Sequence, residues 1–211
     1  MNAIQYFEQH SGEILQATLE HITLVGMTML IAIAIGVPLG ILVARKPWLS
    51  TPILGLANIA ETIPSLALLG MLLPVPWLGE RATRLTVVAL TLYALLPIIR
   101  NTAAGLLGVD PAVREAARGM GMTDRQILFQ VELPLSLSTL LAGVRVATVL
   151  TIGIATVAAA VGAGGLGEYI FRGLAMVNNS LILAGAVPAA ALALLADFLL
   201  SILERRLRPA L

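Results

Sequence analysis

Long apolar stretches alternate with short polar intervals along this chain of 211 residues. A helix needs about 20 mainly apolar residues to cross a bilayer, and five stretches have that length. They cover roughly residues 21–43, 52–73, 85–107, 134–161 and 181–203. Only helices and closed barrels of strands satisfy all their backbone hydrogen bonds in hydrocarbon. The stretches lack the period-two alternation of membrane strands, so helices are expected. The pattern predicts an all-α integral membrane protein with about five transmembrane helices.

The longest polar interval runs from Asp110 to Pro134 and carries three arginines and four acidic residues. So many charges cannot lie in hydrocarbon at a tolerable cost, and we expect the interval to face water or another protein. Asp110 is a favourable N-cap. Pro111 suits the first helical position, because the N–H that it lacks would have no intrahelical partner there. A short helix is therefore predicted to begin at Pro111.

Gly119 and Gly121 are expected to end this helix, because glycine accepts backbone angles that other residues resist. A second helix is predicted from Thr123, since Gln126 three residues later can complete a capping box. We expect that helix to end at Pro134. The polar interval is thus predicted to form an elbow of two short helices.

The composition supports a membrane protein, with 58% hydrophobic residues, 12% charged residues and a mean hydropathy of +0.94. Such a chain is too apolar for a soluble domain. The formal net charge is +1 and the basic residues are scattered, so a nucleic-acid partner is not expected. The sequence has no cysteine, which excludes disulfides, thiolate metal sites and a cysteine nucleophile.

The first 20 residues contain three glutamates and no lysine or arginine. A secretory signal needs a positive start followed at once by an apolar core, so we expect no cleaved signal. Residues 1–20 are predicted to be a short amphipathic extracytoplasmic segment. The transmembrane domain is predicted over residues 21–204, followed by a cytoplasmic tail over residues 205–211.

Basic residues in the loops predict the orientation, because they concentrate on the cytoplasmic side of a membrane. With the elbow inside, eight basic residues lie in cytoplasmic segments and three lie outside. The N-terminus is then outside and the C-terminus inside. The inside set is Arg45, Lys46, Arg114, Arg118, Arg125, Arg205, Arg206 and Arg208, and the outside set is Arg81, Arg84 and Arg172.

A spaced set of residues in the elbow resembles the EAA motif of permease subunits in ATP-binding-cassette importers. The set is Glu115, Ala116, Ala117, Gly121, Val131, Leu133 and Pro134, with Val131 where isoleucine is usual. The resemblance implies that residues 108–134 form a cytoplasmic loop, and that its short coupling helix sits in a cleft of the ATPase subunit. It also implies the MetI-like permease fold of type I importers.

Four longer stretches are similar to permeases of the osmoprotectant importers. They are TIPSLALLG from residue 62, LYALLPIIRNT from residue 92, EAARGMGM from residue 115 and VGAGGLGEYIFRGL from residue 161. The similarity implies import of glycine betaine, choline, carnitine or a related compound across the bacterial cytoplasmic (inner) membrane. The alternatives are a permease for methionine or another small solute, a secondary transporter, and a membrane scaffold that transports nothing.

The same resemblance implies the partners and cofactors. Two ATPase subunits would carry ATP and Mg²⁺, a second permease chain of the same or a different kind would complete the path, and an extracytoplasmic binding protein would deliver the solute. Lys46 is the only lysine and lies outside any phosphate-binding sequence G-x-x-x-x-G-K-[ST]. We therefore expect this chain to be a non-catalytic subunit without a cofactor or metal of its own. His10 and His21 are predicted to be surface or interfacial residues.

Glu61 and Pro64 mark an unusual place in the second predicted span, because one is ionisable and the other removes a backbone hydrogen bond. We expect a kink on the translocation path or a packed hinge. Glu61 is the candidate path-lining residue, with Pro64, Ser65 and Tyr93 as companions, since a carboxylate would attract a cationic headgroup. The alternative is that Glu61 is a protonated or hydrogen-bonded residue that packs helices.

Arg145 and Asp197 lie in the fourth and fifth predicted spans. At a rise of 1.5 Å per residue they fall at similar depths, and a charge at such a depth is tolerable when it is paired. We therefore expect an ion pair between them. Gly162, Gly164 and Gly167 match G-x-G-x-x-G, but they follow a membrane helix rather than a strand, so a dinucleotide site is not expected.

Overall fold

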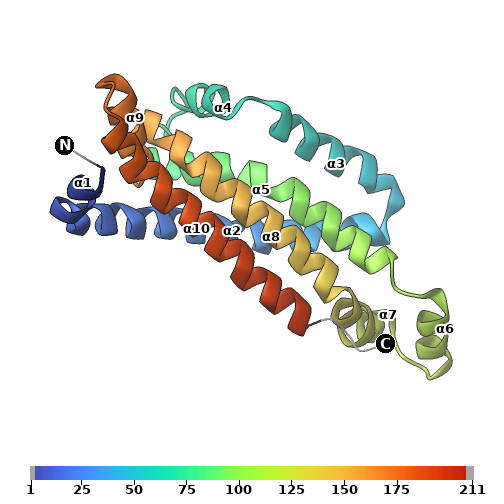
Figure 1. Ribbon diagram of the computed structural model, residues 1–211. Coiled ribbons are helices and arrows are strands. Elements are labelled where there is room, and N and C mark those ends of the chain that lie inside the picture. The colour runs from blue at the N-terminus through green and yellow to red at the C-terminus, as the bar shows by residue number, and fades with distance from the viewer. Residues whose placement is uncertain (1–2, 208–211) are drawn as a thin grey trace.

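The computed structural model describes residues 3–207, and within that range the chain is helical with no strand. Among these described residues, four helices are long and apolar enough to span a membrane, and a bent pair of shorter helices would make a fifth span. Figure 1 shows the four long helices as one slanted bundle. They are α2 (Ser11–Arg45), α5 (Ala82–Leu107), α8 (Leu133–Val157) with the short elements that continue it, and α10 (Asn179–Arg206). The predicted all-α membrane fold is confirmed.

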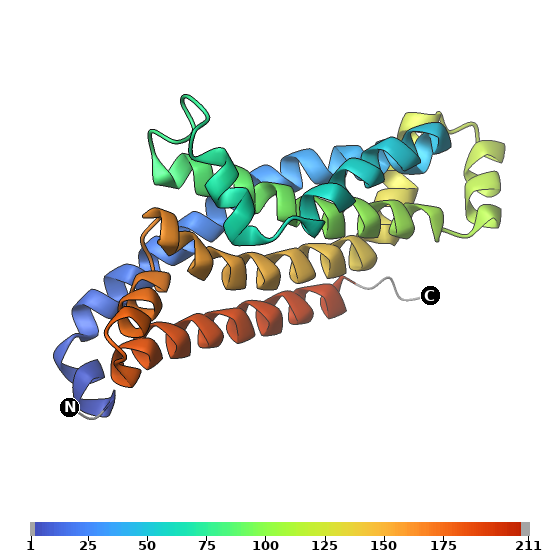
Figure 2. The ribbon, with the colours of Figure 1, turned by 90° about the horizontal axis from the view of Figure 1, so that it is seen from above.

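Shorter elements connect the spans or flank them. They are α1 (Ala3–Gln9), α3 (Pro47–Thr62), α4 (Ser65–Leu72), α6 (Pro111–Gly119), α7 (Asp124–Gln126), the π-helical turn η1 (Ile127–Glu132), the 3₁₀ turn η2 (Ala158–Val161) and α9 (Gly167–Ala175). α6 lies at one end of the bundle, and α1 and α9 lie at the opposite end (Figures 1 and 2).

α5 forms the core of the bundle, packed between α2 and α8. Its side chains Leu90 and Ile98 have no exposed surface. On the facing helix, a Cβ at Gly143 would lie 2.5 Å from the Cβ of Asn101 and 2.7 Å from the carbonyl oxygen of Pro97. Only glycine therefore allows α8 to approach α5 this closely, as small residues do between membrane helices.

α10 lies at the edge of the bundle beside α8 and carries few buried residues (Figure 2). Its outward side chains, including Leu194, Phe198 and Leu199, are exposed and apolar. Such a surface is stable in contact with lipid tails or with another membrane helix.

The helix that contains the first predicted span begins at Ser11, ten residues before the apolar stretch begins at residue 21. Within the predicted amphipathic segment, Ala3–Gln9 form the seven-residue helix α1 and residues 11–20 belong to α2. Polar side chains support this start of α2, because Gln16 Nε2 donates to Glu20 Oε1 at 3.2 Å across one helical turn. Hydropathy marks where hydrocarbon would begin, and a helix can extend beyond it into water.

The second span is broken into two helices, so the kink predicted at Pro64 is confirmed. α3 and α4 are bent by 98° relative to each other. Ile63 between them has an extended backbone, with φ of −70° and ψ of 128°. A proline disfavours the α conformation in the residue before it, and Pro64 therefore accounts for the break.

The predicted end of the second elbow helix at Pro134 is wrong. α7, η1 and α8 run on as one helical span from Asp124. Within it, the N–H of Leu133 donates to the carbonyl of Leu128, five residues earlier. A proline in a regular helix clashes with the carbonyl four residues before it, and the wider π turn relieves that clash. The elbow thus contains one free helix, α6, and the extended base of the fourth span.

Candidate functional site

The elbow begins with a capped helix at one end of the bundle. Asp110 Oδ1 accepts a hydrogen bond from the N–H of Ala112 at 2.8 Å, and Pro111 occupies the first turn of α6. Both features are confirmed as predicted. The cap satisfies a free N–H group at the helix start. This stabilises α6, which is only nine residues long.

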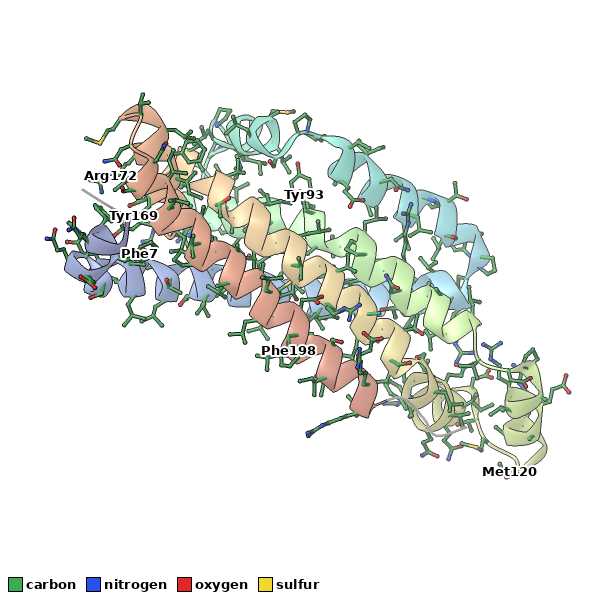
Figure 3. The ribbon with its side chains drawn as sticks, viewed as in Figure 1. Phe7, Tyr93, Met120, Tyr169, Arg172 and Phe198 are labelled. Atoms are coloured by element: carbon green, nitrogen blue, oxygen red, sulfur yellow. The ribbon has the colours of Figure 1, made fainter. Side chains whose placement is uncertain are left out.

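The turn after α6 has the geometry that its residues predict. Gly121 has φ of +80°, in the left-handed region that favours glycine. The capping box is confirmed, because the N–H of Thr123 donates to Gln126 Oε1 at 2.8 Å and the N–H of Gln126 donates to Thr123 Oγ1 at 3.4 Å. Met120 lies at the tip of this turn and is 75% exposed (Figure 3).

The seven residues of the EAA-like set differ in exposure. Ala117 is buried, Val131 and Leu133 are half-buried, and Glu115, Ala116, Gly121 and Pro134 are exposed. One member of the set is thus buried, and four leave side-chain or backbone atoms accessible.

A buried carboxylate lies behind α6, and the sequence reasoning missed its role. Glu132 of η1 is 3% exposed. Its Oε1 lies 2.9 Å from Nε of Arg114 on α6, and its Oε2 accepts a hydrogen bond from Arg45, the last residue of α2. We call Glu132, Arg45 and Arg114 the Glu132 node. The sequence does contain a signal for this node, because Glu132 stands alone between apolar residues. A glutamate is rarely buried unless it is paired.

The break between α3 and α4 opens a pocket of about 270 Å³ beside α5 and α8. Its lining is Glu61, Thr62, Ile63, Pro64, Ser65, Tyr93, Leu150 and Ile154. The structure thus brings together all four residues that were predicted to line a path. Glu61 is exposed in this single chain.

Tyr93 fixes the backbone at this break. Its hydroxyl donates a hydrogen bond to the carbonyl of Ile63, and Figure 3 shows the ring between α5 and the broken span. Backbone polar groups at membrane depth need a partner within the protein, and the tyrosine supplies one where the helix is interrupted.

Arg145 lies close to two acidic side chains of α10. Its Nε is 3.5 Å from Oδ1 of Asp197, and its Nη1 is 3.4 Å from Oε2 of Glu204. The side chain of Asp197 is 52% exposed, whereas that of Glu204 is 13% exposed. The sequence predicts a pair of Arg145 with Asp197, and the structure places Glu204 beside this pair as a third charge.

His21 is buried, so its predicted surface position is wrong. It is 1% exposed, and its Nε2 lies 3.1 Å from the carbonyl oxygen of Ile152 on α8. The side chain faces the bundle because residue 21 lies on the side of α2 that packs against α8. Across residues 3–207, no group of three or more His, Asp or Glu side chains is placed to hold a metal ion.

Comparisons with known proteins cover nearly the whole chain. Residues 36–209 match the family described as "Binding-protein-dependent transport system inner membrane component". The carnitine transport permease protein OpuCB of Listeria monocytogenes is 41% identical over 206 residues, which cover 98% of this chain and 93% of that protein. The choline transport system permease protein OpuBB of Bacillus subtilis is 40% identical over 207 residues, covering 98% and 94%.

The fold also matches a solved structure. A chain from inward-facing conformations of the MetNI methionine ABC transporter superposes with a TM-score of 0.84 and 25% identity, covering 95% of this chain and 98% of that chain. The fold predicted from the elbow motif is therefore confirmed.

Proposed function

This chain belongs to the family of binding-protein-dependent transport system inner membrane components, and from that membership we propose that it is the permease through which an ATP-driven importer moves quaternary ammonium osmoprotectants. Glycine betaine, choline and carnitine are the solutes proposed. The observation that carries this proposal is the similarity, over 98% of the chain, to permeases named for carnitine and choline.

The pocket at the broken helix suits a weakly held cation. A quaternary ammonium group donates no conventional hydrogen bond, and it is attracted by carboxylates and by aromatic faces. Glu61 and Tyr93 supply one of each. A tight site for such a group uses a cage of several aromatic rings, and this lining contains one. The pocket therefore fits a step along a path, with selection of the solute made by a separate binding protein.

The elbow suits a surface that an ATPase moves. We propose that two ATPase subunits, which carry ATP and Mg²⁺, contact α6 of this chain and of a second permease chain. ATP binding would then shift both elbows and change which end of the path is open. A ligand shifts such an equilibrium only when it interacts differently with the two states, so the contacts at α6 must differ between them.

The orientation is part of the same proposal. The end of the bundle that carries α6 and the Glu132 node would face the cytoplasm, and the end with α1 and α9 would face outside. A cytoplasmic reporter fused after Leu211 should be active, and an inactive reporter would contradict this orientation.

Uptake by the purified complex tests the proposed solute. The permease, the ATPase that co-purifies with it and the cognate binding protein are reconstituted in liposomes with ATP inside. We expect uptake of radiolabelled choline or glycine betaine, and no uptake when ATP is omitted. Uptake of methionine without uptake of either osmoprotectant would contradict the proposal and favour an amino-acid permease. Methionine is the first alternative to test because the solved structure with a similar fold belongs to a methionine transporter.

A further inference from the structure

The Glu132 node connects four helical elements at the base of the bundle. Glu132 belongs to η1, which continues into α8, while Arg114 belongs to α6 and Arg45 ends α2. Arg114 also donates through Nη2 to the carbonyl of Leu106 in the last turn of α5. Removing one partner from a buried ion pair leaves an uncompensated charge, which is strongly unfavourable. The carboxylate therefore joins η1, α6 and α2, and Arg114 extends this connection to α5.

The π turn explains how this carboxylate reaches the node. Ile127 and Glu132 are the two buried residues of η1, and they are five positions apart. In an α-helix, residues five apart point about 140° away from each other, because each residue turns the helix by about 100°. In a π turn, residues five apart are hydrogen-bonded neighbours. The turn thus places both side chains toward the interior, and such turns are frequent at functional sites.

Two short segments connect α6 to the elements before and after it in the chain. The helix is joined to α5 through residues 108–110, and to α7 through the turn that contains Gly121. η1 is the element against which α6 packs, and Arg45 reaches the same glutamate from α2. Contact between the elbow and the first span therefore runs through Glu132.

We propose that Glu132 is a positioning residue for coupling, which fixes α6 to the bases of α2 and α8 so that these three elements move as one body when α6 is displaced. The inference rests on the proposed function only in naming an ATPase as the source of the displacement. Without the carboxylate, α6 swings on its two loops and its displacement is not passed to α2.

Distances between spin labels on α6 and at the end of α2 test this arrangement. Because the sequence contains no cysteine, two can be introduced at the exposed residues Lys46 and Ala112. Pulsed electron resonance then gives the distance distribution in the complex with its ATPase, without nucleotide and with ATP trapped. We expect one narrow distribution, at the same position in both states, when Glu132 is present. Glu132→Gln should broaden it by several ångströms.

A matched variant and a functional readout separate coupling from general damage. Arg205→Gln removes one exposed charge near the end of α10 and should leave the distribution unchanged. In Glu132→Gln, stimulation of ATP hydrolysis by the solute-loaded binding protein should fall by about tenfold, within the range of typical coupling between sites. If Glu132→Gln fails to assemble, Arg45→Gln frees α2 alone and should broaden the same distribution.

Two results would overturn the inference. One is a wild-type distance that changes when ATP is trapped, and the other is a Glu132→Gln distribution as narrow as that of the wild type. If the proposed function were wrong, no ATPase would co-purify with the chain. The distance between the two labels could still be measured in the permease alone, and would still test whether Glu132 holds α6 to α2.

Discussion

The hydroxyl of Tyr93 donates a hydrogen bond to the carbonyl of Ile63, at the point where the second span breaks (Figure 3). Tyr93 belongs to α5, the central helix, and is 7% exposed. The bond therefore ties an irregular segment of backbone to the most deeply buried of the described spans. Since both residues line the pocket, the shape of the pocket depends on this hydroxyl.

Replacing Tyr93 with phenylalanine should destabilise the break. The ring remains, but the carbonyl of Ile63 loses its partner, and an unsatisfied buried polar group costs about 1–3 kcal/mol. We expect a lower melting temperature of the detergent-solubilised complex and slower uptake. Tyr6→Phe, at a partly exposed position of α1, is the control and should change neither. An unchanged melting temperature for Tyr93→Phe would show that water or another group satisfies the carbonyl.

Glu61→Gln should reduce transport according to the charge of the solute. The change keeps the size of the side chain and removes its negative charge from the pocket. Choline is a cation, whereas glycine betaine carries its own carboxylate, which a glutamate repels. We expect choline uptake to fall by about tenfold, corresponding to a loss of about 1.4 kcal/mol, and glycine betaine uptake to change less. The ratio of the two initial rates measures the effect.

Ser65→Ala serves as the matched control for Glu61→Gln, because it alters the same pocket without changing its charge. It should leave the ratio of choline to glycine betaine uptake as in the wild type. Wild-type choline uptake by Glu61→Gln would show that this carboxylate does not act on the solute.

Local signals were sufficient to predict the spans and the start of the elbow. Apolar length located the long helices, and short-range hydrogen bonds at Asp110 and Thr123 set the caps that their sequences indicate. These features depend on residues at most three positions apart. The parts of the elbow that sequence analysis predicted correctly are therefore those whose physical cause lies within one helical turn.

The contacts that the sequence did not reveal join distant residues. The carbonyl of Ile63 accepts from a tyrosine 30 positions away, Glu132 is paired with an arginine 87 positions away, and His21 contacts a carbonyl 131 positions away. Hydropathy along the chain does not record which face of a helix meets another helix. Buried polar residues are stable only when such partners exist, so their roles emerge with the fold.

The charge cluster of Arg145 should respond unequally to removal of its members. Arg145 faces two carboxylates, so Arg145→Gln leaves both Asp197 and Glu204 without this cation and should reduce the amount of folded protein in the membrane more than Asp197→Asn does. Exchanging the charges with Arg145→Asp and Asp197→Arg should recover part of the loss in the single variants. Recovery is expected to be incomplete because the new aspartate lies beside Glu204. The yield of the complex by size-exclusion chromatography measures each effect, and no recovery at all would contradict a direct pair.

Gly121 offers a test of the elbow that separates backbone conformation from side-chain volume. A Cβ at this position meets nothing within 4 Å, so the φ of +80° is what limits substitution. Left-handed angles cost a residue with a side chain about 1–2 kcal/mol, more for β-branched residues, and least for asparagine. Gly121→Val should therefore change the direction in which α6 leaves the turn, whereas Gly121→Asn should preserve it.

Uptake in liposomes should accordingly be lost in Gly121→Val and largely retained in Gly121→Asn. Capture of the solute by the isolated binding protein should be the same with either variant, because that step precedes any movement of the elbow. Equal loss in both variants would indicate that a partner contacts the bare backbone at Gly121, since asparagine fills that space without straining the turn. Equal retention would show that the direction of α6 after this turn does not control transport.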